Sequence, residues 1–200
     1  MSPVVRVADV DEDALLADSR ADGDSPAEQV LALARAKAQK IADSIESSGE
    51  FAGSGHAVLV VGCDSMLEFH GEVLGKPHDA DVALERVMAL SGDSGVLHTG
   101  HWVVLVNEDA SDDDVVQAGG TESTVVKFAA FSEAEARAYV ATGEPLEVAG
   151  SFTIDGLGGA FIRGVEGDPH NVIGISLPLL RHLFGHMGVF WPSLWAKPQS

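Results

Sequence analysis

Asp64 and Lys76 are the two residues of this sequence whose types and spacing best suit a chemical role. Asp64 closely follows the apolar run 56–61, and Lys76 comes a dozen residues later between a glycine and a proline. An acid at the carboxyl end of a buried strand lies where open α/β sheets place their ligands. A carboxylate there can hold a divalent cation, and a nearby ammonium can bind an anion. The pair therefore indicates a site for a metal-bound phosphate.

A buried strand and a long helix are the elements expected to position these residues. The run 56–61 is typical of a strand covered on both faces, as in a parallel or mixed sheet. The capping box 25–28, with proline at the first helical position, predicts a helix that ends near Ser44. Lys37 falls on the apolar face of this helix. A lysine on an apolar stripe is most often a snorkelling stem, so this pattern by itself leaves its role open.

The rest of the chain alternates between strands and helices. Short apolar runs predict a hairpin at 67–74 and strands near 4–8 and at 97–107, 123–131 and 160–165. Capping residues predict helices at about 80–90, from 132 to about 143, and at 177–186. Polar or glycine-rich composition predicts loops at 9–24, 46–55 and 107–120. The alternation predicts the α/β fold class.

Length and composition restrict the class of protein. Two hundred residues with 46% hydrophobic content can bury one substantial core without disulfides. The formal net charge of −19 argues against binding a DNA or RNA polymer, but not against a single nucleotide held by a few cations. The lone Cys63 excludes a disulfide framework and a multi-cysteine zinc site, and fits a reducing cytosol. We find neither a signal peptide nor an apolar run of membrane-spanning length, and expect a soluble cytoplasmic protein that binds no membrane.

Two histidine pairs have spacings that suggest metal binding, but neither makes a strong candidate site. His182 and His186 are four residues apart on an expected helix, and no third ligand is obvious nearby, so surface or core histidines are the favoured interpretation. His98 and His101 lie on an expected strand and face opposite ways. The sequence also lacks the nucleophile-elbow signature of a serine hydrolase.

A set of ordered fragments carries a resemblance to a known family. The fragments are VDE at 10–12, ARAKA at 34–38, GCDSM at 62–66, GKP at 75–77, YVATGEP at 139–145, IDG at 154–156 and GDPHNVIGISLPLL at 167–180. In this order and spacing they resemble the Maf proteins, which are nucleoside triphosphate pyrophosphatases. The resemblance covers roughly residues 4–188.

The resemblance implies an architecture. Maf and inosine triphosphatase-like proteins have an elongated mixed β-sheet flanked by helices, in two lobes with the active cleft between them. We therefore expect a single domain over residues 1–188, followed by a tail at 189–200 that lies outside the family pattern. Two tryptophans in this tail are expected to pack on the body of the protein.

The resemblance also implies an activity and its residues. Members hydrolyse nucleoside triphosphates, including modified or non-canonical ones, to the monophosphate and pyrophosphate with a divalent cation, Mg²⁺ or Mn²⁺. By position in the motifs, Asp64 and Glu12 would be the catalytic and metal-binding acids, and Lys37 and Lys76 would bind phosphate. Whether Asp64 holds the metal or takes a proton from the attacking water stays open, as does whether the protein forms a homodimer.

Ser65 and Asp155 occupy the positions that the resemblance links to the choice of substrate base. Pyrimidine-preferring members carry glutamine at the position of Asp155, and methylguanine-preferring members carry glutamate. A carboxylate offers only acceptors, which suits the N–H donors of guanine, but aspartate is shorter than glutamate. Ser65 matches neither subfamily, so pyrimidine and methylated guanine both remain candidate bases.

Maf proteins normally begin with a strand and an S-x-S-x-R-R loop that binds the triphosphate, and this sequence starts at the strand expected after them. Losing one donor of this kind costs about a few kcal/mol of transition-state stabilisation, so we expect the 200-residue chain to be weakly active at best. The alternative to an enzyme is a catalytically impaired Maf-like regulator that binds a nucleotide or a protein and is linked to cell-division arrest. The joint presence of Glu12, Lys37, Asp64 and Lys76 favours the enzyme.

Overall fold

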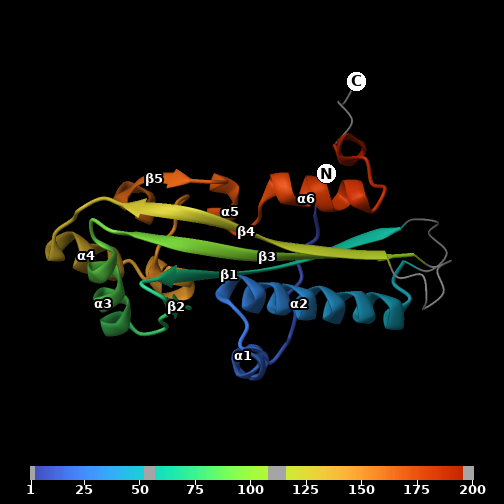
Figure 1. Ribbon diagram of the computed structural model, residues 1–200, viewed down its shortest axis with the longest axis horizontal. Helices are drawn as coiled ribbons and strands as arrows, with labels where there is room; N and C mark the ends of the chain where they lie inside the picture. Colours follow the sequence, from blue (N-terminus) through green and yellow to red (C-terminus); the bar gives the residue numbers. More distant parts are fainter. Residues whose placement is uncertain (1–2, 52–56, 108–115, 196–200) are drawn as a thin grey trace.

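An elongated sheet, five-stranded in the part of the chain that the structure describes, runs through the molecule (Figure 1). The computed structural model describes residues 3–51, 57–107 and 116–195. Among these residues the strand order is β2-β1-β3-β4-β5, and each pairing is antiparallel. The strands are β1 (Val58–Phe69), β2 (Glu72–Leu74), β3 (Ser94–Val106), β4 (Val116–Phe128) and β5 (Ile162–Glu166).

Helices cover both faces of this sheet. The long α2 (Pro26–Ser48) lies along one face, and α6 (Leu177–His186) lies on the opposite face (Figure 1). The other helices are α1 (Glu12–Asp22), which packs on α2, α3 (Ala80–Leu90), α4 (Glu133–Val140) and α5 (Pro169–Ile173). Short 3-10 helices are η2 (Glu144–Glu147), η3 (Ala149–Ser151), η4 (Leu157–Phe161) and η5 (Trp191–Leu194). Within the described ranges, none of the helices combines the length and the apolarity that a membrane crossing needs.

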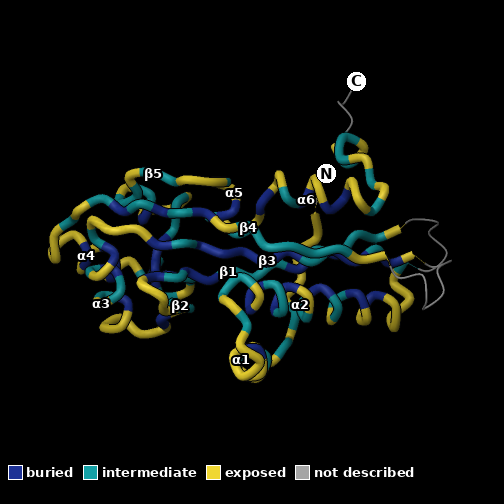
Figure 2. Tube along the Cα trace, viewed as in Figure 1, coloured by how far each residue is buried: buried dark blue, intermediate teal, exposed yellow. Residues whose placement is uncertain are grey.

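Buried residues follow the sheet from one end to the other (Figure 2). Near α3 the core is a cluster that includes Leu67 and Phe128. Under α2 a second cluster joins Ala42 to Val104, and α6 contributes Leu183 to a third on the opposite face. Both faces of the long strands are therefore covered, and the expected α/β class with an elongated sheet flanked by helices is confirmed.

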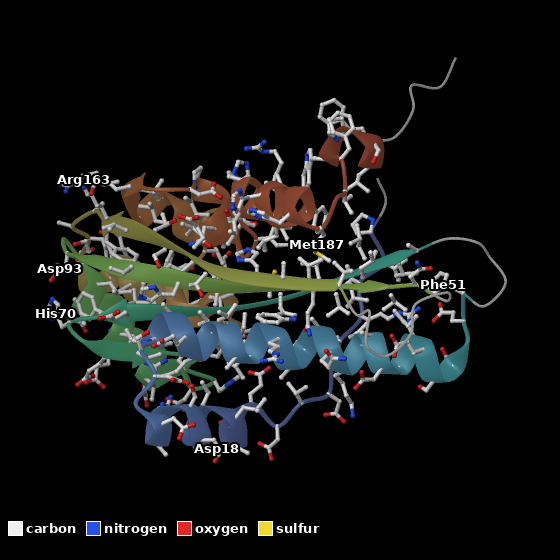
Figure 3. All side chains as sticks on the ribbon, turned by 45° about the vertical axis from the view of Figure 1, so that its right-hand side comes forward. Asp18, Phe51, His70, Asp93, Arg163 and Met187 are labelled. Carbon is white, nitrogen blue, oxygen red and sulfur yellow. The ribbon has the colours of Figure 1, made fainter. Side chains whose placement is uncertain are left out.

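The β1–β2 hairpin expected at 67–74 is present. His70 and Gly71 form its turn with φ values of 51° and 81°. These left-handed values suit glycine well and are uncommon for other residues. His70 and Asp93 lie near each other at one end of the sheet (Figure 3), with His70 Nε2 3.0 Å from Asp93 Oδ2. This contact ties the hairpin to the segment that precedes β3.

Two glycines let α2 approach the sheet closely enough to position the site. A Cβ atom at Gly62 of β1 would lie 2.2 Å from the carbonyl oxygen of Ala34, and one at Gly100 of β3 would lie 2.2 Å from that of Val30. Real Cβ atoms do not come this close to backbone, so both positions require glycine while the helix keeps its place. This close contact brings Lys37 of α2 to the face of β1.

Gly62→Ala should destabilise the protein, because the added methyl group must push the backbone of α2 away from β1. Overpacking of this kind costs about 1–3 kcal/mol in the free energy of unfolding. Gly185→Ala is the matched control, since its Cβ would meet nothing within 4 Å and alanine favours the helix by about 1 kcal/mol. Chemical denaturation of the wild type and both variants checks the prediction. A free energy of unfolding of Gly62→Ala equal to that of Gly185→Ala would contradict it.

Several sequence-based expectations were wrong. The sheet, expected to be mixed, is antiparallel in the pairings that the described residues make. Residues 4–8 form no strand, and the expected loop 9–24 contains α1, which Asp11 caps by accepting from the Ala14 N–H and which Gly23 ends in a left-handed conformation. β4 begins at Val116 rather than near residue 123, and α2 continues four residues past Ser44. Residues 52–56 and 108–115 of the expected loops lie outside the described part.

The other expected elements agree with the structure. The helix 80–90 is present with Asp79 as its cap, as is the helix 177–186. Trp191 packs against Phe184 of α6, with ring centroids 5.5 Å apart, as expected for the tail. Trp195 in contrast is largely exposed.

Candidate functional site

A lysine held between two carboxylates forms the centre of the candidate site. The Nζ atom of Lys37 lies 2.5 Å from Asp64 Oδ1 and 2.7 Å from Glu12 Oε1. The side chains of Lys37 and Asp64 are 20% and 15% exposed, and that of Glu12 is 46% exposed. Three elements that are separate in the sequence, α1, α2 and β1, therefore converge on one cluster with an accessible side.

The local structure explains how each element presents its side chain. Glu12 is the first residue of α1, directly after the capping Asp11. Asp64 lies in the middle of β1 and pairs with Gly100 of β3. The expected position of Asp64 at the carboxyl end of its strand was therefore wrong, because the backbone pairing with β3 continues beyond this acid to Glu68. The ion pair with Lys37 offsets the cost of placing a carboxylate on a covered face.

Burial and charge act in opposite directions on this cluster. Burial raises the pKa of Asp64 above its ordinary value, and the negative charge of Glu12 adds to the rise. The hydrogen bond and charge of Lys37, and the charge of Lys76, oppose it. Burial alone would lower the pKa of Lys37, but its contacts with Asp64 and Glu12 outweigh burial and raise it. Lys37 therefore stays charged, while Asp64 is a stronger proton acceptor than an exposed aspartate.

Lys76 approaches the cluster from the segment after β2. Its side chain is exposed, and its charge acts on the pKa of Asp64. The segment is fixed on both sides of the lysine: Pro77 is buried, and Arg86 of α3 donates from Nη1 to the carbonyl oxygen of Gly75 at 2.8 Å. Arg86 was not predicted from the sequence, in which the scarcity of basic residues was the one signal that could have indicated it.

Ser65 lies apart from the acid that precedes it. Adjacent residues of a strand point to opposite faces, and the Ser65 hydroxyl lies 2.8 Å from Thr99 Oγ1, which donates to the carbonyl oxygen of Asn171. Asn171 is fully buried and donates to Leu97 O and other acceptors of the sheet. Ser65 thus belongs to a polar network under α5.

Asp155 is exposed in the loop between η3 and η4. Its neighbours are bound to Glu144 of η2: Thr153 Oγ1, Leu157 N–H and Gly158 N–H all donate to that carboxylate. The structure therefore places Glu12, Lys37 and Asp64 together, Lys76 beside them, and Asp155 on a separate loop.

The other candidate groups behave as ordinary side chains. Burial raises the pKa of Cys63 to about 12, so its thiol stays protonated at neutral pH. His98 contacts Glu68 and Ser123, whereas His101 accepts from the Ser176 N–H, as their opposite faces predicted. The exposed rings of His182 and His186 pack edge to face. In the described part of the chain, no three His, Cys, Asp or Glu residues gather as a metal site.

The fold and the cluster define an α/β protein with a lysine–carboxylate site suited to a phosphate group and a divalent cation. The family model described as Maf-like protein matches residues 1–187. This chain therefore belongs to the Maf-like protein family, as its sequence fragments predicted.

Curated relatives agree with this assignment. The chain is 48% identical over 198 residues to a nucleoside triphosphate pyrophosphatase of Nocardia farcinica, covering 99% of this chain and 89% of that protein. It is 47% identical over 196 residues to one of Rhodococcus opacus, covering 98% and 87% respectively. A protein of the same name from Streptomyces coelicolor is 46% identical over 200 residues, covering 100% of this chain and 87% of that protein.

Proposed function

We propose that this protein is a nucleoside triphosphate pyrophosphatase, a hydrolase that converts a nucleoside triphosphate to the monophosphate and pyrophosphate. The observation that carries the proposal is the convergence of Glu12, Lys37 and Asp64, with Lys76 acting on the same acid. In a chain of net charge −19, Lys37 and Lys76 offset the two carboxylates of this site, so that a bound divalent cation would give it the net positive charge that a polyanion needs. The names of the relatives support the same activity.

The donor set fits Mg²⁺ or Mn²⁺. Asp64 and Glu12 supply carboxylate oxygens, and they already surround one positive charge, the ammonium group of Lys37. Mg²⁺ is commonly bound through one or two carboxylates, with substrate phosphates and water as its other ligands. We propose these two acids as its protein ligands. When bound, such a cation offsets the negative charge that develops on the phosphates during the reaction.

The residues of the chain then have separate roles. A water molecule attacks the α-phosphorus, a new oxygen–phosphorus bond forms, and the bond to the bridging oxygen of the leaving pyrophosphate breaks. Asp64, whose pKa burial raises in the absence of a cation, would accept the proton of this water through the carboxylate oxygen that does not hold the cation. Lys76, on a segment fixed by Pro77 and Arg86, meets the phosphate oxygens. Lys37 keeps Asp64 and Glu12 together and contributes positive charge.

We further propose that Asp155 recognises the base of the substrate through hydrogen bonds. We also propose that the protein acts in the cytoplasm, on free nucleotides rather than on nucleic acid polymers. The exposed carboxylate of Asp155 can accept hydrogen bonds from N–H donors of a base. Strong net acidity is unsuited to a polymer of phosphates. A lone half-buried cysteine is compatible with a reducing compartment.

Pyrophosphate release from UTP, dTTP, CTP, GTP and 7-methyl-GTP is the experiment that tests the proposed substrate class. Asp155→Gln should change the rank order of these substrates, because an amide adds an N–H donor where the carboxylate offers only acceptors. Asp93→Asn removes an equal charge from the segment before β3, where the carboxylate contacts His70 rather than the loop of Asp155, and should keep the order. An unchanged order in Asp155→Gln would remove Asp155 from base recognition.

A further inference from the structure

Glu144 organises the loop that carries Asp155. Its carboxylate accepts hydrogen bonds from Tyr139 Oη at 2.9 Å, Thr153 Oγ1 at 2.5 Å, and the N–H groups of Leu157 and Gly158, each at 2.9 Å. These donors come from α4, from the residues before Asp155 and from the start of η4. One side chain therefore holds both ends of the segment 153–158.

The geometry of the segment shows how closely it wraps the carboxylate. A Cβ atom at Gly156 would lie 2.6 Å from Thr153 Oγ1 and 2.7 Å from Glu144 Oε2. One at Gly158 would lie 2.4 Å from Tyr139 Oη. Gly158 must be glycine because its Cβ would also lie 2.7 Å from the backbone oxygen of Thr153, and a Cβ at Gly156 would displace the side chains that make these hydrogen bonds. Asp155 lies in the middle of this segment.

The electrostatics agree with this geometry. Burial acts to raise the pKa of Glu144, but the hydrogen bonds from Thr153, Gly158, Leu157 and Tyr139 outweigh it and lower the pKa to about 2. The carboxylate is thus ionised at every pH at which the protein would be assayed. An ionised carboxylate has only acceptors, which matches the four donors that face it.

The short helix η2, which begins at Glu144, also holds the segment that carries Lys76. The N–H of His78 donates to the carbonyl oxygen of Leu146 at 3.2 Å, two residues after Glu144. Between Lys76 and His78 lies the buried Pro77. η2 therefore contacts one segment through the Glu144 side chain and the other through its backbone, and it fixes the two segments relative to each other.

We infer that Glu144 is a positioning residue for substrate binding. Through η2 it sets the place of Asp155 relative to Lys76, and so the distance between the groups that meet the base and the phosphates. This inference rests on the proposed function, which gives Lys76 and Asp155 those roles. A shift of about 1 Å in such a group can cost on the order of a hundredfold in rate.

Glu144→Gln and Glu147→Gln form a matched pair for the test. Both remove one negative charge from η2, but Glu147 is exposed and its carboxylate lies 3.6 Å from His78 Nδ1. In Glu144→Gln the new NH₂ group faces donors, so hydrogen bonds to the loop are lost. Hydrogen exchange of the Leu157 and Gly158 amides reports on the loop without any activity, and steady-state kinetics over the nucleotide panel report on substrate binding.

We expect faster exchange at both amides, a KM raised by about tenfold with a smaller change in kcat, and a flattened substrate rank order in Glu144→Gln alone. If Glu144→Gln does not fold, Thr153→Val removes one donor and should show the same changes at reduced size. Wild-type KM and rank order in a folded variant with faster exchange would overturn the inference. A wild-type protein inactive on all nucleotides would instead refute the proposed function, and unchanged exchange would refute the role of Glu144 in the loop.

Discussion

Replacing Asp64 with asparagine should lower the turnover of nucleoside triphosphates by at least about two orders of magnitude, the usual scale for a group that transfers a proton. Asparagine keeps the size of the side chain but cannot accept the proton of the attacking water or bind a cation as a carboxylate does. The fold should persist, because Lys37 keeps its ion pair with Glu12. Steady-state pyrophosphate release measures the loss.

Asp18→Asn is the control for this variant. Asp18 is an exposed residue of α1, the helix that also carries Glu12 (Figure 3). The control should retain wild-type kcat and KM, since it changes the net charge equally without touching the cluster. Near-normal turnover in Asp64→Asn would remove this acid from the mechanism.

Replacing Lys37 with methionine should have an effect of similar size and should also change the pH dependence. Without the ammonium group, Asp64 and Glu12 face each other uncompensated. The hydrogen bond and charge of Lys37 oppose the rise that burial causes in the pKa of Asp64, so their loss lets this pKa rise further. The acid limb of the kcat/KM profile should therefore move to higher pH, with activity reduced by about a hundredfold.

Lys40→Met is the matched control on the same helix. Lys40 is exposed and lies about one turn beyond Lys37, so its loss removes a charge without altering the cluster. We expect the wild-type pH profile for this variant. A Lys37→Met protein whose acid limb stays in place would show that Lys37 does not control the ionisation of Asp64.

The parts of the site that the sequence predicted are those with local signals. The capping box at Ser25 and Glu28 fixes the start of α2, so the apolar face that carries Lys37 could be identified. The position of Asp64 within its strand could not, because it depends on pairing with Gly100, which is 36 residues away. An apolar run that breaks at Gly62 resembles a strand end, whereas the glycine is there to admit α2.

Other differences have equally specific causes. α1 was missed because its acidic sequence has a weak apolar pattern. Its N-cap Asp11 and its C-terminal Gly23 are nevertheless common helix-capping residues. Alternation along a strand does imply that Ser65 and Asp64 point to opposite faces, and this signal was present in the sequence. Glu144 and Arg86 act on backbone groups 11 to 14 residues away, which only the folded chain brings within reach.

The central claim is that this site hydrolyses the bond between the α- and β-phosphates, and hydrolysis in H₂¹⁸O with Mg²⁺ or Mn²⁺ tests it most directly. The account predicts equal amounts of nucleoside monophosphate and pyrophosphate, with the ¹⁸O in the monophosphate, and no such products from Asp64→Asn. The rate measured in the same experiment tests the expectation of weak turnover. Release of inorganic phosphate with a diphosphate, label in pyrophosphate, or binding of nucleotide without any product would contradict the account, and the last result would favour a regulator.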